Sequence, residues 1–266
     1  MKVDKFRTVI IYIIIILLGL VCLLPLLNIV AISFSSSAAV EGNMVGLIPV
    51  GFSTAAYEKI LEDSQFWHSF LISVERVVLT LIINFVLIVL MAYPLSKTNA
   101  QFRGRNIYAN LMIFAMLFNG GMIPTFLLVK SYGLLNTVWA LVLPGAVPIF
   151  NVILVMNFFA AVPKELEEAA FIDGANPLQV LTKIFIPISK PVLATVSLFS
   201  IVGSWNDFYS GLIYMSKAAY YPLMTYIQSL QINVEDLIKQ GNLSAVVDSA
   251  SLGNTNLNAA KIVIAV

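Results

Sequence analysis

The first charge-free run of the sequence extends from Thr8 to Val40, and its most apolar part is about Val9–Ile32. A bilayer's hydrocarbon core, about 30 Å thick, needs roughly 20 apolar residues of helix to cross it. The run therefore predicts a membrane helix. A secretory signal is the alternative, because Lys2, Lys5 and Arg7 precede the run, but its apolar core is longer than that of a typical signal.

Further apolar segments predict a polytopic membrane protein. The expected spans are about Val77–Ser96, with Glu75 and Arg76 in outer turns of a helix starting near Trp67, then Asn106–Val129, Val138–Ala160 and Pro191–Ser216. Mean hydropathy is +0.92 and only 11% of residues are charged, whereas about a quarter are charged in soluble domains. Composition therefore agrees with the spans.

The sequence ends inside an apolar run, "AAKIVIAV". We expect Asn258–Val266 to be the first half of a sixth membrane helix, with the gene continuing past Val266, because this stretch is too short to cross a bilayer. The predicted fold class is all-α: an integral membrane bundle of six transmembrane helices, the sixth truncated.

Lysine and arginine lie in alternate connections, which predicts the orientation of the chain. Positive charges occur at the N-terminus, in the second connection (Lys97, Arg103, Arg105) and near residue 164 onward (Lys164, Lys183, Lys190). All three regions are expected in the cytoplasm. Residues 33–65 and 217–255 then face outward, with Ser53 as N-cap of a short outer helix.

Several function classes lack support in the sequence. A formal net charge of +1 gives no basic surface for nucleic acid. The single histidine, His68, and single cysteine, Cys22, form no metal-ligand or catalytic set. We therefore expect no metal and no enzyme activity. No phosphate-binding G-x-x-x-x-G-K-[ST] motif occurs, so we expect this chain not to bind or hydrolyse ATP.

One polar stretch interrupts the apolar sequence, "EAAFIDGANPLQVLTKIFIP" at residues 168–187. Pro163 fits the first position of a helix, which needs no amide donor, and Gly174 fits its C-terminal stop. A helix over about 163–173 is predicted.

A second short helix is predicted directly after that glycine. Asn176 can cap a helix that begins at Pro177, with Gln179 completing a capping box. The residue before Pro187 is expected to leave helical geometry. The result is a cytoplasmic helical hairpin too short to span a membrane.

The hairpin carries a spaced motif: Glu168-Ala169-Ala170, three residues, Gly174, nine residues, then Ile184-x-Ile186-Pro187. This pattern resembles the EAA loop of permease subunits of binding-protein-dependent ABC importers, with Ile186 where leucine is usual. The stretches "LIPVGFSTAAY", "LEEAAFIDGA" and "WNDF" are similar to the carbohydrate-uptake branch, and "FNGGMIPTFLLVKSYGLLNT" is similar to members that import complex oligosaccharides.

The resemblance implies a MetI-like type I importer fold, in which residues 1–66 hold an N-terminal helix and an extracytoplasmic segment. Residues 67–266 would form the permease domain, with a coupling hairpin at 161–190. The residues implied to contact the ATPase are Glu168, Ala169, Ala170, Asp173, Gly174 and Pro187.

The same resemblance implies partners in the bacterial inner membrane. These are a cytoplasmic pair of ATPase subunits that use ATP and Mg, a second and different permease chain, and an extracytoplasmic solute-binding protein. The cargo is expected to be a sugar or oligosaccharide.

Polar residues inside the spans are candidates for the substrate path, because such groups are costly unless they face a cavity or a partner. The candidates are Trp205, Asn206, Asp207 and Asn119, the last within a glycine-rich kink. Asp207 could instead brace a neighbouring helix, and Gly120 and Gly121 could serve close helix packing; both alternatives stay open. Interhelical hydrogen bonds are expected for Asn84, Asn151 and Asn157.

A stand-alone, ion-coupled transporter is the alternative function. That class is expected to show paired intramembrane carboxylates or an inverted repeat. One clear intramembrane carboxylate and no repeat are found in the sequence, which favours the importer subunit.

Overall fold

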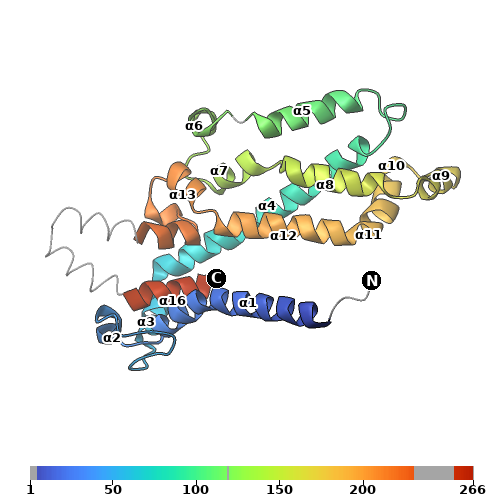
Figure 1. The fold of residues 1–266 in the computed structure, drawn as a ribbon. Coiled ribbons are helices and arrows are strands. Elements are labelled where there is room, and N and C mark those ends of the chain that lie inside the picture. The colour runs from blue at the N-terminus through green and yellow to red at the C-terminus, as the bar shows by residue number, and fades with distance from the viewer. Residues whose placement is uncertain (1–4, 119, 231–254, 266) are drawn as a thin grey trace. The chain divides into compact units, whose positions relative to one another are not determined.

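The computed structural model describes residues 5–118, 120–230 and 255–265, and every regular element within those ranges is a helix (Figure 1). The all-α prediction is therefore confirmed for the described part of the chain. The described residues form two compact units: one comprises residues 5–68, 226–230 and 255–265, the other residues 69–118 and 120–225.

The first unit contains the long N-terminal helix. Its elements are α1 (Lys5–Ser33), α2 (Ser37–Glu41), α3 (Ala55–Glu62) and α16 (Thr255–Ala265), and α16 packs along α1. The geometric N-cap of α3 is Thr54, one residue later than predicted, although the Ser53 hydroxyl does accept the Ala55 N–H at 3.3 Å. Ser53 therefore contributes to this helix start from one position further out.

A partly buried ion pair joins two segments of the first unit. Lys261 of α16 donates to Asp63 Oδ2 at 2.6 Å, and the Tyr226 hydroxyl donates to the same oxygen at 2.9 Å. Burial alone would raise the pKa of Asp63, but hydrogen bonds from Lys261, the Phe66 N–H and Tyr226 together hold that pKa below its usual value. The pair therefore keeps Asp63 ionised where the chain enters the next helix.

The second unit is built on α4 (Ser64–Leu95), which starts in the first unit. Its other elements are α5 (Arg105–Leu117), α6 (Met122–Ser131), α7 (Val138–Val142), the 3₁₀ turn η1 (Leu143–Gly145), α8 (Ile149–Ala160), α9 (Lys164–Ile172), α10 (Pro177–Val180), the π turn η2 (Leu181–Phe185), α11 (Ile186–Ile188), α12 (Lys190–Asn206), α13 (Tyr209–Tyr214) and the 3₁₀ turn η3 (Ala218–Tyr220).

Two helices of the described residues are long and apolar enough to cross a membrane, Thr8–Ser33 and Ser64–Leu95. Up to five spans result if three bent helix pairs each count as one. The third span is broken, as the glycine-rich kink predicts: α5 ends at Leu117 and α6 begins at Met122. The second break was not predicted: in the fourth span, α7–η1 and α8 meet at 47°. Prolines at 144 and 148 in the second break remove backbone donors, which explains the interruption there.

The fifth predicted span is also shorter than expected. Helix α12 ends at Asn206, and Asp207 is its C-cap, with φ −77° and ψ 99°. The Ser210 N–H donates to Asp207 Oδ1 at 3.1 Å, so this side chain satisfies the first turn of α13. Asp207 therefore lies in a break between two helices, not within one.

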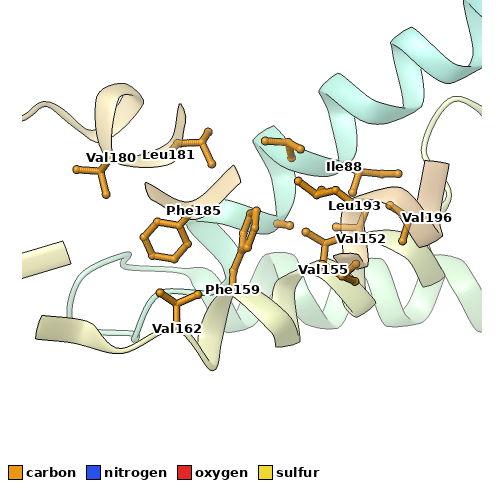
Figure 2. Close-up of a cluster of buried hydrophobic side chains, with 13 residues drawn as sticks. Ile88, Val152, Val155, Phe159, Val162, Val180, Leu181, Phe185, Leu193 and Val196 are labelled. Atoms are coloured by element: carbon orange, nitrogen blue, oxygen red, sulfur yellow. The ribbon is translucent and has the colours of Figure 1, made fainter. Parts of the chain in front are cut away.

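The hydrophobic core of the second unit joins α4, α8, α12 and the hairpin (Figure 2). Phe159 of α8 and Phe185 of η2 pack edge to face with centroids 5.4 Å apart. Val180 and Leu181 are also buried in this cluster. The hairpin is therefore anchored in the helix bundle by apolar side chains, while α9 extends beyond it (Figure 1).

Candidate functional site

The hairpin has the local geometry that its sequence predicts at the turn. Gly174 adopts φ +82°, a left-handed conformation that favours glycine. The Asn176 carboxamide accepts the Gln179 N–H at 2.9 Å, and the Gln179 side chain accepts the Asn176 N–H at 2.9 Å. The capping box is confirmed. Pro163 is the N-cap of α9 and not, as predicted, its first helical residue; the helix begins at Lys164.

The prediction for Pro187 is wrong. Ile186, which precedes it, is helical with φ −59° and ψ −50°, and α11 continues through the proline. A π turn over Leu181–Phe185 directly precedes α11. Because a π turn widens the helix, the chain can pass the proline, which lacks an N–H, without ending.

The residues assigned to ATPase contact fall into two environments. Glu168, Ala169, Asp173, Gly174 and Pro187 are exposed, whereas Ala170 is partly buried against the core. Large apolar side chains are exposed beside them: Leu166, Phe171, Ile172 and Leu178. The two alanines therefore do not form one free surface, and the exposed face of the hairpin is a mixed apolar and acidic one.

The sequence analysis missed Glu167, the neighbour of Glu168. Glu167 is buried, and its carboxylate pairs with Lys97 Nζ at 2.7 Å, just beyond the end of α4. The Tyr93 hydroxyl approaches the same carboxylate at 3.4 Å. The Lys97 ammonium also lies over the rings of Tyr93 and Phe185, 4.1 and 4.2 Å from their centroids.

These contacts tie α4, α9 and η2 together at one point. Burial lowers the pKa of Lys97, and its hydrogen bond and ion pair with Glu167 oppose that shift without cancelling it. Removing the Glu167 charge would therefore leave a cation in a site that disfavours it. The only sequence signal was a cationic residue directly after a span.

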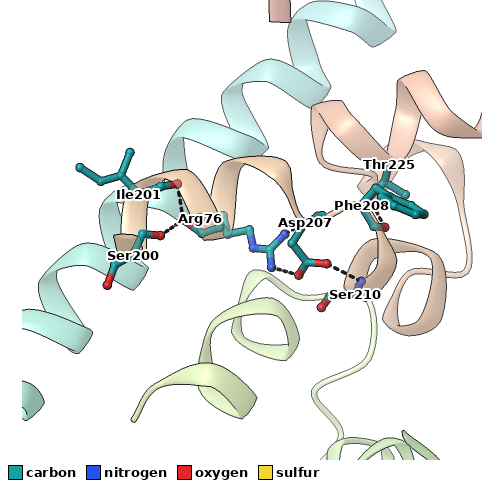
Figure 3. A network of polar contacts seen from close by, with 8 residues as sticks. Arg76, Ser200, Ile201, Asp207, Phe208, Ser210 and Thr225 are labelled. Carbon is teal, nitrogen blue, oxygen red and sulfur yellow. Dashed lines mark hydrogen bonds and ion pairs between the residues drawn. The ribbon is translucent and has the colours of Figure 1, made fainter. Parts of the chain in front are cut away.

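A cavity of about 280 Å³ with a mixed polar and apolar lining lies in the second unit, among α4, α7, η1, α8, α12 and α13. Arg76 and Asp207 form an ion pair at its edge, with Nη2 2.5 Å from Oδ2, and Arg76 Nη1 donates to the Asp207 carbonyl at 2.9 Å (Figure 3). Asp207 thus has the bracing contact that the sequence analysis left open, and it lines the cavity as well.

The other substrate-path candidates do not gather there. The Trp205 ring packs edge to face on Phe70 with centroids 5.9 Å apart. The Asn206 amide donates to the Val202 carbonyl of its own helix at 2.9 Å. Asn119 lies outside the described residues.

The predicted role of Asn84 is confirmed. Its amide donates to Ser200 Oγ of α12 at 3.2 Å, an interhelical hydrogen bond. Asn151 is buried at the same cavity, whereas Asn157 is exposed.

Comparison with known proteins identifies the family. Residues 77–252 match the model of the binding-protein-dependent transport system inner membrane component. This chain belongs to that family. The permease resemblance drawn from the hairpin is confirmed, and the chain is a multi-pass inner membrane component of an ABC transporter.

Similar permeases extend over most of the chain. Protein LplC of Bacillus subtilis is 42% identical over 214 residues, 80% of this chain and 72% of LplC. The polygalacturonan/rhamnogalacturonan transport system permease protein YtcP of the same organism is 38% identical over 262 residues, 98% of this chain and 90% of YtcP.

A solved structure supports the MetI-like fold. A bacterial ABC transporter involved in the import of the acidic polysaccharide alginate has a chain that superposes with TM-score 0.84 at 32% identity, covering 100% of this chain and 93% of that one. The MetI-like permease fold is therefore confirmed at both the sequence and the structural level.

Proposed function

We propose that this permease imports oligosaccharides derived from an acidic polysaccharide, which an extracytoplasmic binding protein delivers. Two similar proteins support the cargo class: YtcP is named for polygalacturonan and rhamnogalacturonan, and the superposed chain comes from an alginate importer. The chain works as one of two permease subunits, its partner being a different chain. It is a transport component and performs no catalysis itself.

The observation that carries the importer role is the exposed hairpin, whose base is buried in the helix bundle. Its tip presents Glu168, Ala169 and Asp173 to the solvent while Glu167 and Phe185 hold its base in the bundle. A protruding element with apolar and acidic side chains, whose base is packed against the helix bundle, suits docking into a groove of another protein. The partner is the cytoplasmic ATPase pair, which binds ATP and Mg.

The contacts at the base of the hairpin explain how movement of the ATPase reaches the membrane helices. When the ATPase subunits close, they displace α9; the Lys97–Glu167 pair carries this displacement to α4, and the core carries it to α8 and α12. Helices α4, α8 and α12 are among those that line the cavity. Movement of the hairpin can therefore change access to the interior of the permease.

Orientation follows from the same proposal. A hairpin that meets a cytoplasmic ATPase requires the N-terminus and the connection after α4 on the cytoplasmic side, in agreement with the positions of lysine and arginine.

The test is uptake by the complete transporter in proteoliposomes, with the ATPase inside and the loaded binding protein outside. We expect uptake of trigalacturonate that requires both ATP and the binding protein. Glu168→Arg should abolish uptake and copurification of the ATPase while the chain stays in the membrane. Uptake that proceeds without ATP, driven by an ion gradient, would overturn the proposal.

A further inference from the structure

Three polar side chains of α4 face the cavity at four-residue intervals: Arg76, Thr80 and Asn84. Residues with this spacing lie on one face of a helix. Each is more than nine-tenths buried, with exposed fractions of 4%, 8% and 3%. Such a stripe is unusual in an apolar helix, because buried polar groups require partners.

Each of the three residues has one atom without a hydrogen-bond partner: Arg76 Nε, Thr80 Oγ1 and Asn84 Oδ1. Buried polar atoms in native proteins are almost always paired with protein or water. Three orphaned atoms in one cavity therefore indicate that something else supplies their partners in the working transporter.

The hydrogen bonds that surround the three atoms show whether each is left as a donor or as an acceptor. The Ser200 hydroxyl donates to the Val196 carbonyl, so its oxygen accepts the Asn84 amide and the Asn84 carbonyl oxygen is left as an acceptor. Arg76 uses its terminal nitrogens on Asp207, which leaves Nε as a donor. Thr80 can donate or accept.

The charge balance of the cavity disfavours an anionic group as its ligand. Asp207 neutralises Arg76 (Figure 3), so the cavity carries no surplus positive charge. A carboxylate only accepts hydrogen bonds and would face the free acceptor of Asn84. A hydroxyl both donates and accepts, and a sugar ring presents several hydroxyls together.

We propose that this cavity binds the hydroxyl groups of the saccharide as it passes through the permease, with Arg76 Nε, Thr80 Oγ1 and Asn84 Oδ1 as its contacts. The inference rests on the proposed function and adds the site. Gly203, Phe199 and Pro144 line the same cavity and are exposed on the isolated chain, so this chain by itself does not close the cavity there. Recognition of the acidic groups lies elsewhere in the transporter.

The decisive variant is Thr80→Val, which keeps the side-chain shape and removes only the orphaned hydroxyl. In proteoliposomes containing the complete transporter, we expect the maximal rate of trigalacturonate uptake to fall about three- to tenfold, the effect of one lost hydrogen bond. The KM for the loaded binding protein should not change. The melting temperature should be equal or higher, because no protein contact is lost. Thr195→Val, on the exposed side of α12, is the control and should behave as wild type.

A second variant tests whether the saccharide needs the volume of the cavity, independently of hydrogen bonds to its walls. Gly203 lines the cavity, and an added Cβ there meets no atom within 4 Å, so Gly203→Leu can fold and add a large side chain at the cavity wall. Uptake should fall while assembly is normal, and Gly19→Leu on α1, where space is also open, serves as control.

The outcomes separate the two proposals. Wild-type uptake rates in both Thr80→Val and Gly203→Leu would show that the cavity holds water only and would overturn this site. A wild-type transporter that hydrolyses ATP but takes up no trigalacturonate would instead contradict the proposed function.

Discussion

Adjacent glutamates of α9 occupy different environments, which separates their roles. Glu167 is buried and paired with Lys97, whereas Glu168 is exposed at the hairpin surface. Glu167→Gln should lower the free energy of unfolding by roughly 3 kcal/mol, because it leaves a buried cation without its counter-charge. Glu168→Gln should change stability by less than about 0.5 kcal/mol and instead weaken copurification of the ATPase.

Thermal melting and pull-down of the purified variants measure the two effects. Exchanging the partners, Lys97→Glu with Glu167→Lys, should recover part of the stability that either single change removes. Equal melting temperatures for Glu167→Gln and Glu168→Gln would contradict the assigned division of roles.

The pair of Arg76 and Asp207 permits a similar test at the cavity. Asp207→Asn should destabilise the chain by about 3 kcal/mol, because the Arg76 charge, 4% exposed, loses its counter-charge. The double variant Arg76→Met, Asp207→Leu should be closer to wild type in stability, because two apolar groups replace a pair. Should the single variant melt like wild type and lose only uptake, the carboxylate acts on the substrate and not as a brace.

At the scale of elements, α13 approaches Thr225 closely at Gly211. A Cβ at Gly211 would lie 2.9 Å from Thr225 Cβ and closer still to its hydroxyl oxygen, which donates to the Phe208 carbonyl. Gly211→Ala should therefore cost about 1–3 kcal/mol through overpacking. Gly19→Ala, in open space on α1, is the matched control. Thermal melting of Gly211→Ala and Gly19→Ala measures this cost. Equal melting temperatures for the two variants would contradict the close packing at Gly211.

The hairpin turn calls for a second element-scale test. Gly174→Asp places a side chain at φ +82°, where a non-glycine residue costs about 1–2 kcal/mol, and adds charge to the docking surface. Gly133→Asp imposes comparable strain at φ +67° away from the hairpin. We expect loss of uptake and of ATPase copurification for Gly174→Asp alone. Equal losses in both variants would mean that strain, not docking, is responsible.

Local elements of the fold were predictable from sequence, and distant contacts were not. Gly174 and the Asn176–Gln179 capping box depend on residues within a few positions, and both were predicted correctly. The Lys97–Glu167 and Arg76–Asp207 pairs join residues 70 and 131 positions apart, so no local pattern shows them. The helical path through Pro187 was missed because a π turn has no clear sequence signature.

At the scale of the whole molecule, the exposed apolar surface matches a subunit that works only in a larger assembly. None of the most apolar stretch of α1 is buried within the chain, although its mean hydropathy is 3.2. Helix α5 also buries no residue. In water such surfaces would aggregate, so lipid must cover them in the membrane, and the proposed second permease chain would cover a part.

The single native cysteine allows the topology of the chain to be tested. Cys22 lies in α1 and is exposed on the isolated chain. If α1 spans the bilayer, a membrane-impermeant maleimide should not label Cys22 in intact cells but should label it in detergent.

In a Cys22→Ala background, Lys59→Cys on α3 should be labelled from outside. Ala169→Cys on the hairpin should react only after the cells are opened, because the proposed function places the hairpin against the cytoplasmic ATPase. Labelling of Ala169→Cys in intact cells would invert the orientation and remove the ATPase from reach of the hairpin, and with it the proposed coupling.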